Sequence, residues 1–376
     1  MSFALTEQQE MLRDTLRDYL AAQGSTRPLR AADAVAPGPG SPLWKGLAEE
    51  MGILGLPFPE DRGGLGLGPV ETMVVMEELG RGLVNEPVLE GVVVAAALLA
   101  HLPAETAEPL IADIVSGAAI PAFAHVEPGA RDDRHDVQLS ATPRDGGFVL
   151  NGLKAIVVGG DKAATFIVSA RTSGARNDAE GLALFLVDGD APGVSRRSYR
   201  LLDGRVACDL VLENVVAGQA VGTPGQAAAI IDEVLDVATA ALSAEAAGVM
   251  RRLTLDTLDY TQNRRQGGKA LAEHQVVQHR IVDMALLAEQ GSALAQAAAL
   301  KIGGSAQERA MAVSAAKAFV SRTVKTVGQA AVQLHGGMGM TDEIAIGNLF
   351  RRATMIERQL GSADYHLDRW EQASLA

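Results

Sequence analysis

The chain of 376 residues is 48% hydrophobic and only 4% aromatic, and it carries a formal net charge of −13 at pH 7. This length favours two or three lobes over one simple core. So negative a chain is a poor partner for nucleic acid, because phosphate binding needs a positive surface. Cys208 is the only cysteine, which excludes an internal disulfide and fits a reducing compartment.

The first 118 residues predict a helical domain. Thr6 and Gln9 have the spacing of a capping box, and apolar residues recur behind them at helical intervals. The same periodicity returns in four stretches: 44–51, 70–81, 92–99 and 107–115. The Gly-rich segment 63–68 has the wrong spacing for a dinucleotide loop, so we interpret it as a connection between helices.

The start of the chain is polar and lacks the apolar core of a signal peptide. The most apolar run covers residues 91–100, which is too short to cross a bilayer and is typical of a buried helix. We therefore expect a soluble, cytoplasmic protein with no membrane partner.

Residues 119–223 predict an all-β domain. Short runs rich in valine, isoleucine and phenylalanine alternate there with Gly, Asp, Asn and Pro, as is typical of strands and turns. The sequences RDGGF at 144–148 and LDGR at 202–205 predict hairpin turns.

Residues 224–376 return to the helical pattern and predict a four-helix bundle. Three long alanine-rich runs have helical periodicity: 230–260, 273–302 and 306–334. One cysteine and seven scattered histidines give no zinc spacing, so we expect no metal site.

Two motifs lie at the ends of these bundle helices, YTQNRRQGG at 260–268 and QLHGGMGM at 333–340. Arginine forks suit phosphate oxygens, and a glycine pair permits close approach of a ligand. Cationic residues also stabilise helix C-termini, and glycine commonly ends helices. Taken alone, each motif favours the structural explanation.

Taken in order, these segments resemble the acyl-CoA dehydrogenase family along nearly the whole chain. The run LAEEMGILGLPFPEDRGGLGLGPVETMVVMEELGRGL at 47–83 is similar to two family helices and their loop. FAHVEPGARDD at 123–133 is similar to the loop Thr-Glu-Pro-Gly-Ala-Gly-Ser-Asp, and FVLNGLKAIVV at 148–158 to the strands that end in Trp-Ile-Thr. YTQNRRQGG resembles the Arg-x-Gln-Phe-Gly segment, and AVQLHGGMGMTDE at 331–343 the Gln-x-x-Gly-Gly flavin motif.

The resemblance implies an N-terminal helical domain, a β-barrel-like middle domain and a C-terminal four-helix bundle. This order agrees with the helical, strand-rich and helical patterns of the sequence. It also implies a tetramer that holds FAD and oxidises an acyl-CoA thioester between Cα and Cβ. An electron-transfer flavoprotein would take up the electrons. This chemistry needs a carboxylate base near the thioester and a flavin fixed beside it.

The chain departs from the family at the catalytic base. Counting without gaps from Gly336 and Gly337 places Leu360 where the family has the Glu of Tyr-Glu-Gly-Thr. Gly361 and Ser362 keep that register. Leucine cannot accept a proton, so we expect no catalytic residue at the usual position.

Two other carboxylates are fallback candidates for the base. Glu357 lies three residues before Leu360, and Glu245 lies on the helix that precedes the arginine motif. Some relatives place the base on that helix, but the matching position is Ala238. Asp236 matches an acidic position that contacts substrate in some relatives.

The cofactor residues implied by the resemblance form two groups. The first, the β-domain group, would serve a flavin held by the chain itself and consists of His125, Val126, Ile156, Val157 and Val158. The second, the bundle group, would serve the flavin of a neighbouring subunit and consists of Arg264, Gln266, His274, Gln275, Gln333, Leu334, His335, Gly336 and Gly337.

Departures from the family concentrate near the β-domain group. Residues 156–158 replace Trp-Ile-Thr, which removes an aromatic face and a hydroxyl. Arg131 and Asp132 replace Gly-Ser, and Asp132 would repel a pyrophosphate. The bundle group matches, and the nearby departure is Gly267 in place of the usual Phe. The preserved residues would therefore serve the flavin of a partner.

We therefore predict a non-catalytic subunit of a heteromeric FAD-dependent acyl-CoA dehydrogenase, whose second subunit supplies the Glu and the flavin face. The C-terminal segments also resemble the small-subunit branch, including pimeloyl-CoA dehydrogenase small subunits, of enzymes that degrade fatty acids or sterol side chains. Two alternatives stay open: a self-sufficient homo-oligomer with a non-standard base, and a scaffold that holds acyl-CoA without oxidising it.

Overall fold

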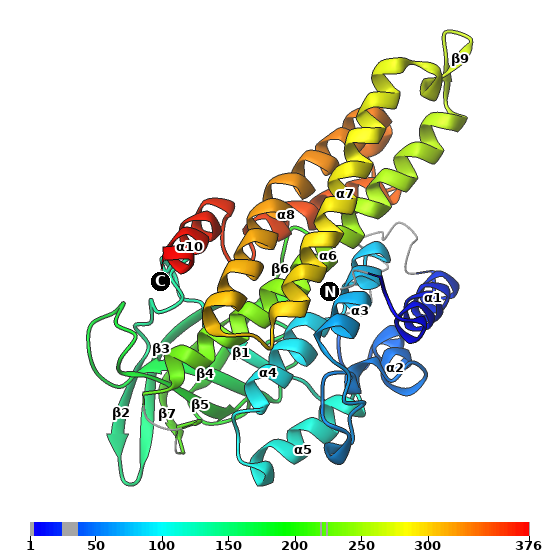
Figure 1. Ribbon diagram of the computed structural model, residues 1–376. Coiled ribbons are helices and arrows are strands. Elements are labelled where there is room, and N and C mark those ends of the chain that lie inside the picture. The colour runs from blue at the N-terminus through cyan, green and yellow to red at the C-terminus, as the bar shows by residue number, and fades with distance from the viewer. Residues whose placement is uncertain (1–3, 25–36, 219, 223–224, 376) are drawn as a thin grey trace. The chain divides into compact units, whose positions relative to one another are not determined.

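The computed structural model describes residues 4–24, 37–218, 220–222 and 225–375. Helices come first, strands follow, and long helices complete the chain, which confirms the predicted order of helical, β and helical segments (Figure 1). The predicted boundary at residues 223 and 224 lies outside the described residues.

The segment before the first strand is helical, as predicted. Its α-helices are α1 (Glu7–Ala22), α2 (Pro42–Glu49), α3 (Pro69–Arg81), α4 (Ala95–Leu99) and α5 (Ala104–Val115). Shorter turns are η1 (Ile53–Gly55), η2 (Glu60–Arg62) and the π-helical η3 (Leu89–Val94). Thr6 and Gln9 form the predicted capping box at the start of α1. The apolar run 91–100 is mostly buried and lies within η3 and α4.

One twisted sheet forms the β segment. Its strands are β1 (Pro121–Ala124), β2 (Ser140–Arg144), β3 (Gly147–Val158), β4 (Thr165–Arg171), β5 (Leu182–Asp188), β6 (Val194–Arg200) and β7 (Val206–Ala217). The sheet has the order β1-β4-β2-β3-β7-β6, with β5 paired to β4. Both predicted hairpins are present, joining β2 to β3 and β6 to β7. Asp145 and Gly146 have φ angles of 47° and 83°, as a tight hairpin turn requires.

The C-terminal segment is a bundle of long helices. Its helices are α6 (Ala227–Asn263), α7 (Gln275–Lys301), α8 (Ala306–His335), α9 (Ala345–Arg358) and α10 (Ala363–Leu375). Between α6 and α7 lie the short strands β8 (Arg265–Gln266) and β9 (Lys269–Ala270) and the turn η4 (Leu271–Glu273), and η5 (Gly336–Met340) follows α8. Figure 1 shows the β8–β9 hairpin at the far end of the long helices.

The chain divides into two compact units. The helical unit contains α1, α3 and the chain from Thr239 onward, and the β unit contains α2, the sheet and the rest of Asn85–Ala238. Within the described residues, none of the helices combines the length and apolar character needed to span a bilayer. Nor do the described His, Cys, Asp and Glu side chains form a group of three or more that could hold a metal ion.

Candidate active site

Leu360 lies in a turn directly after α9, with its backbone in the left-handed region at φ 62°. This conformation is uncommon for leucine, so surrounding contacts must stabilise it. Lys317 of α8 is fully buried, and its Nζ donates to the carbonyl oxygens of Ile356 and Gly361, each at 3.0 Å. His366 donates from Nε2 to the carbonyl oxygen of Leu360 at 2.9 Å. These hydrogen bonds therefore fix the turn, but the Leu360 side chain has no carboxylate that could accept a proton.

Glu245 lies inside the helical unit, where it is 2% exposed and bound by Arg352. The guanidinium donates to both carboxylate oxygens, from Nε at 2.6 Å and from Nη2 at 2.8 Å. A Cβ on Gly80 of α3 would lie 2.2 Å from the carbonyl oxygen of Glu245, so the two helices are in close contact here. A carboxylate bound in this way through both oxygens is poorly suited to take a proton from a substrate.

Glu357 is the fallback base closest in sequence to the Leu360 turn. Its Oε1 lies 3.2 Å from Nζ of Lys325 on α8, and its side chain is 21% exposed. The ion pair holds the half-buried carboxylate of Glu357 against α8. Glu357 is therefore more accessible than Glu245, but it points to a lysine of its own unit.

Asp236, the predicted substrate contact, lies in the part of α6 that belongs to the β unit. It is 1% exposed, and its Oδ1 accepts a hydrogen bond of 2.8 Å from Nη1 of Arg134. Arg134 is 7% exposed and belongs to the loop between β1 and β2. The carboxylate is thus engaged by an arginine of the chain itself.

The β-domain group is assembled around a buried lysine that sequence reasoning did not single out. Lys154 of β3 is fully buried and donates from Nζ to Glu127 at 2.6 Å, to Ser169 at 2.9 Å and to the carbonyl oxygen of His125 at 3.1 Å. The backbone N–H of Ala155 also donates to the carbonyl oxygen of Val126 at 2.8 Å. These bonds bring together the two predicted segments, at 125–126 and 156–158.

Burial and the neighbouring Lys154 lower the pKa of His125 to about 3, so its imidazole is neutral at physiological pH. Burial also lowers the pKa of Lys154 to about 8, although the adjacent carboxylate of Glu127 opposes this shift. His125 is 8% exposed and its Nδ1 lies 2.9 Å from the hydroxyl of Ser169, so it is part of the interior and not of the surface. Val126, by contrast, is 45% exposed.

Ile156 occupies a β-bulge with a φ of 55°, which is a true outlier for a β-branched residue. Its N–H donates to the hydroxyl of Tyr199 at 3.1 Å, and that hydroxyl donates to Asp209 at 2.8 Å. Burial, with the Asp209 bond, raises the pKa of Tyr199 to about 12. The structure therefore preserves a strained backbone at this position while presenting a 51% exposed aliphatic side chain.

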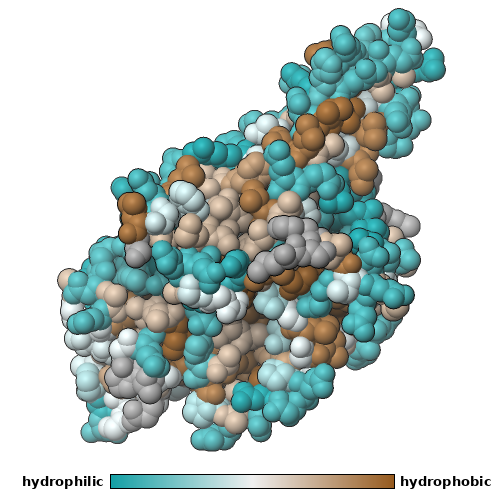
Figure 2. All heavy atoms as spheres, viewed as in Figure 1, coloured by the Kyte–Doolittle hydropathy of each residue, from teal (hydrophilic) through white to brown (hydrophobic). Residues whose placement is uncertain are grey.

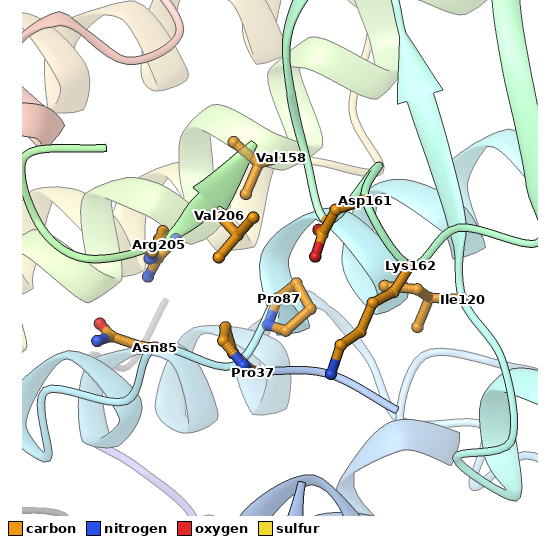
Figure 3. A pocket seen from close by; sticks show the side chains of 10 residues that line it. Pro37, Asn85, Pro87, Ile120, Val158, Asp161, Lys162, Arg205 and Val206 are labelled. Carbon is orange, nitrogen blue, oxygen red and sulfur yellow. The ribbon is translucent and has the colours of Figure 1, made fainter. Parts of the chain in front are cut away.

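A small cavity lies beside Val158 in the β unit (Figure 3). The ends of β3 and β7 line it together with the side chains of Pro87 and Lys162, and its volume is about 10 Å³. A volume of about 10–15 Å³ holds one water molecule. This cavity therefore has no room for a cofactor ring. In the β-domain group, the side chains of Val126 and Ile156 are exposed, whereas His125 and Val157 are buried.

The bundle group lies on the helical unit. Arg264, Gln266, His274 and Gln275 are all exposed and lie on or beside the β8–β9 hairpin. Gln333, Gly336 and Gly337 are also exposed, at the end of α8. Figure 2 shows hydrophilic residues covering this end of the bundle, with hydrophobic residues gathered below it on the same face.

Tyr260 and His335 connect the two parts of the bundle group. Their rings stack with centroids 4.3 Å apart, and the Tyr260 hydroxyl donates to the carbonyl oxygen of His335 at 3.4 Å. Burial lowers the pKa of His335, and Leu334 beside it is half-buried. Gly336 has φ 61° and ψ −139°, a conformation that only glycine adopts readily. The packed pair thus fixes the exposed glutamine and glycines next to it.

One electrostatic prediction arises from the loop that carries Arg134. The carboxylate of Asp232, whose Oδ2 lies 3.3 Å from Nε2, raises the pKa of His135. The stabilisation by the imidazolium is complete below the unfolded pKa of about 6.5 and is lost as pH rises through the raised pKa. We expect urea unfolding to show a loss of stability as the pH rises above about 6.5, and this loss should be smaller in His135→Gln. An equal loss in both proteins would contradict the assignment.

Three family models match the chain in order. "Acyl-CoA dehydrogenase, N-terminal domain" matches residues 6–118, "Acyl-CoA dehydrogenase, middle domain" residues 122–215, and "Acyl-CoA dehydrogenase, C-terminal domain" residues 227–375. The matches together span most of the sequence.

Individual relatives agree with these matches. The human mitochondrial short-chain specific acyl-CoA dehydrogenase is 27% identical over 378 residues, covering 96% of this chain and 89% of the relative. A variant of the Tcur3481-Tcur3483 steroid ACAD is 29% identical, with a TM-score of 0.87 and 98% of each chain covered. An FAD-dependent dehydrogenase is 25% identical, with a TM-score of 0.87 and 99% of each chain covered.

Proposed function

Since the chain belongs to the acyl-CoA dehydrogenase family, we propose that it is a subunit of an FAD-dependent acyl-CoA dehydrogenase and that a second, related subunit carries the catalytic Glu. The observation that carries the proposal is the Leu360 turn. Lys317 and His366 hold this turn in place, yet leucine stands where the family presents its base. Neither fallback carboxylate replaces it well, because Glu245 is buried against Arg352 and Glu357 pairs with Lys325.

The two cofactor groups differ in how well they fit FAD. The bundle group offers an exposed guanidinium on Arg264, exposed amides on Gln275 and Gln333, and accessible backbone at Gly336, which suit phosphate and polar ring atoms. In the β-domain group the exposed side chains of Val126 and Ile156 are aliphatic and donate no hydrogen bonds, and Val157 is buried. We infer that the bundle group of this chain completes a flavin site whose main part lies on the second subunit. FAD supplies the hydride acceptor of the reaction when bound.

The relatives support two kinds of subunit. The designation of the steroid ACAD, Tcur3481-Tcur3483, joins two names. By analogy, we propose a hetero-oligomer, a tetramer of two subunits of each kind, that oxidises an acyl-CoA from fatty-acid or sterol-side-chain breakdown and passes electrons to an electron-transfer flavoprotein.

The test compares the purified chain with the same chain co-expressed with an acyl-CoA dehydrogenase-like protein encoded beside it. We expect the chain alone to be inactive in acyl-CoA-dependent dye reduction and the complex to be yellow and active. Full activity of the single chain would contradict the proposal. In that case Glu357→Gln decides whether this carboxylate is the base, because loss of a base lowers the rate by about 10²–10⁴-fold.

A further inference from the structure

A groove lies between α7 and α8, which run side by side in the helical unit (Figure 1). Its volume is about 390 Å³. The buried side chains of Met284 and Val327 and the half-buried side chain of Leu287 form its apolar part. The rest of its lining is polar or small and consists of Arg280, Asp283, Thr326, Gln329, Ala330 and Gln333. An exposed apolar surface with a polar rim is typical of a contact with another protein.

Arg280 and Asp283 are the charged residues of this groove. Both are exposed, and neither forms an ion pair or a side-chain hydrogen bond with another described residue. They lie three residues apart on α7, so the two opposite charges are one helical turn from each other. Both charges are therefore available to a partner that enters the groove.

The face of α7 along the groove is self-complementary. Val276, Arg280, Asp283 and Leu287 follow one another at spacings of four, three and four residues, which places all four on one side of the helix. An apolar residue stands at each end of this face, and the two charges lie between them. Val276 is 66% exposed. If two copies of this face pack antiparallel about a two-fold axis midway between the charges, each arginine meets an aspartate and each valine meets a leucine.

We propose that the groove binds α7 of a second copy of this chain, related by a two-fold axis, so that Arg280 and Asp283 of the two copies form two reciprocal ion pairs. Thr326 and Ala330 on the α8 side of the groove have short side chains, which leave room for the second helix. The inference goes beyond the proposed function, because it concerns the contact between two like chains and not the contact with the subunit that carries the Glu.

Sedimentation velocity of the purified full-length chain at several concentrations tests the proposal. We expect a reversible equilibrium between monomer and dimer. Arg280→Asp places like charges opposite each other at both symmetric positions, so it should raise the dissociation constant of the dimer at least about tenfold, and Asp283→Arg should do the same. The double variant Arg280→Asp with Asp283→Arg restores opposite charges across the two-fold axis, so its dissociation constant should return close to the native value.

Two further variants separate the groove from general effects of charge. Lys45→Asp changes the net charge by the same amount as Arg280→Asp, but Lys45 is 70% exposed on α2 in the β unit, so the dimer should be unchanged. Ala330→Trp fills the groove without changing the charge and should weaken the dimer at least about tenfold. Circular dichroism checks that each variant is folded.

A chain that stays monomeric at every concentration would overturn the proposal, and the groove would then belong to a different occupant, such as the subunit that carries the Glu. A dimer that the groove variants do not weaken, or that Lys45→Asp weakens equally, would also overturn it. So would a double variant that fails to recover, because the partner would then not be a two-fold copy.

The oligomeric state is separate from the activity test. A chain that dimerises through the groove and is fully active by itself would refute the proposed subunit role and keep this contact. A monomeric chain that becomes active only with its second subunit would refute this contact and keep the proposed subunit role.

Discussion

Replacing Arg352 by methionine is expected to lower the free energy of unfolding of the protein by about 3–5 kcal/mol, because it leaves the buried carboxylate of Glu245 without its partner. The pair is 2% and 3% exposed at its two side chains, and both carboxylate oxygens are bound. Urea unfolding followed by circular dichroism measures the change. The double variant Arg352→Met with Glu245→Leu should recover most of the loss, since an apolar pair of similar volume is tolerated in place of a buried ion pair.

Arg322→Met is the matched control for this prediction. Arg322 pairs with Asp364 at 3.0 Å, but the two side chains are 61% and 88% exposed, so the loss should stay below about 1 kcal/mol. Equal losses in Arg322→Met and Arg352→Met would show that the buried pair does not form.

A further variant at Glu245 tests whether this carboxylate has a catalytic role. If Glu245 were a base, Glu245→Gln would lower the activity of the complex by about 10²–10⁴-fold, whereas we expect its activity to be retained.

Most of the fold could be predicted from local sequence patterns. Capping residues at Thr6 and Gln9 and the turn chemistry of Asp145 and Gly146 act through neighbours in sequence, so the sequence alone predicted them correctly. The long helices were also predicted within a few residues, because their apolar periodicity extends over many turns. Short elements were harder to predict. The hairpin of β8 and β9 consists of two-residue strands, too short for any periodicity.

Contacts between distant residues account for what the sequence did not predict. Lys154 and Lys317 each lie in an apolar run, and neither was predicted from the sequence to be a buried lysine that donates several hydrogen bonds. A lysine flanked by apolar residues indicates that the lysine is buried, but the sequence does not identify its hydrogen-bond acceptors. Those of Lys317, for example the carbonyl oxygens of Ile356 and Gly361, come from segments far along the chain. The partner of Asp236 is Arg134, which lies 102 positions away in sequence and shares no motif with it.

Replacing Arg264 by alanine is expected to lower the flavin affinity of the assembled complex at least about tenfold, because a hydrogen bond to a charged group contributes about 1.5–3 kcal/mol. Arg264 is exposed at the β8–β9 hairpin of this chain, next to exposed Gln266, and its guanidinium suits a pyrophosphate. If the bundle group serves the flavin of the second subunit, the loss must appear although that subunit is unchanged. Flavin released during gel filtration, measured by its absorbance, gives the affinity.

Arg265→Ala provides the control on the same hairpin. Arg265 is also exposed and pairs through its backbone with Ala270, and its removal changes the charge of the hairpin by the same amount. A general loss of positive charge would weaken flavin binding in both variants alike, whereas a specific contact weakens it in Arg264→Ala alone. Unchanged flavin content in Arg264→Ala would mean that the preserved bundle group does not serve a flavin across the subunit interface. The division of roles between the two subunits would then lose the support of the bundle group, because the exposed arginine and glutamines at this end of the bundle would no longer explain how the chain contributes to catalysis.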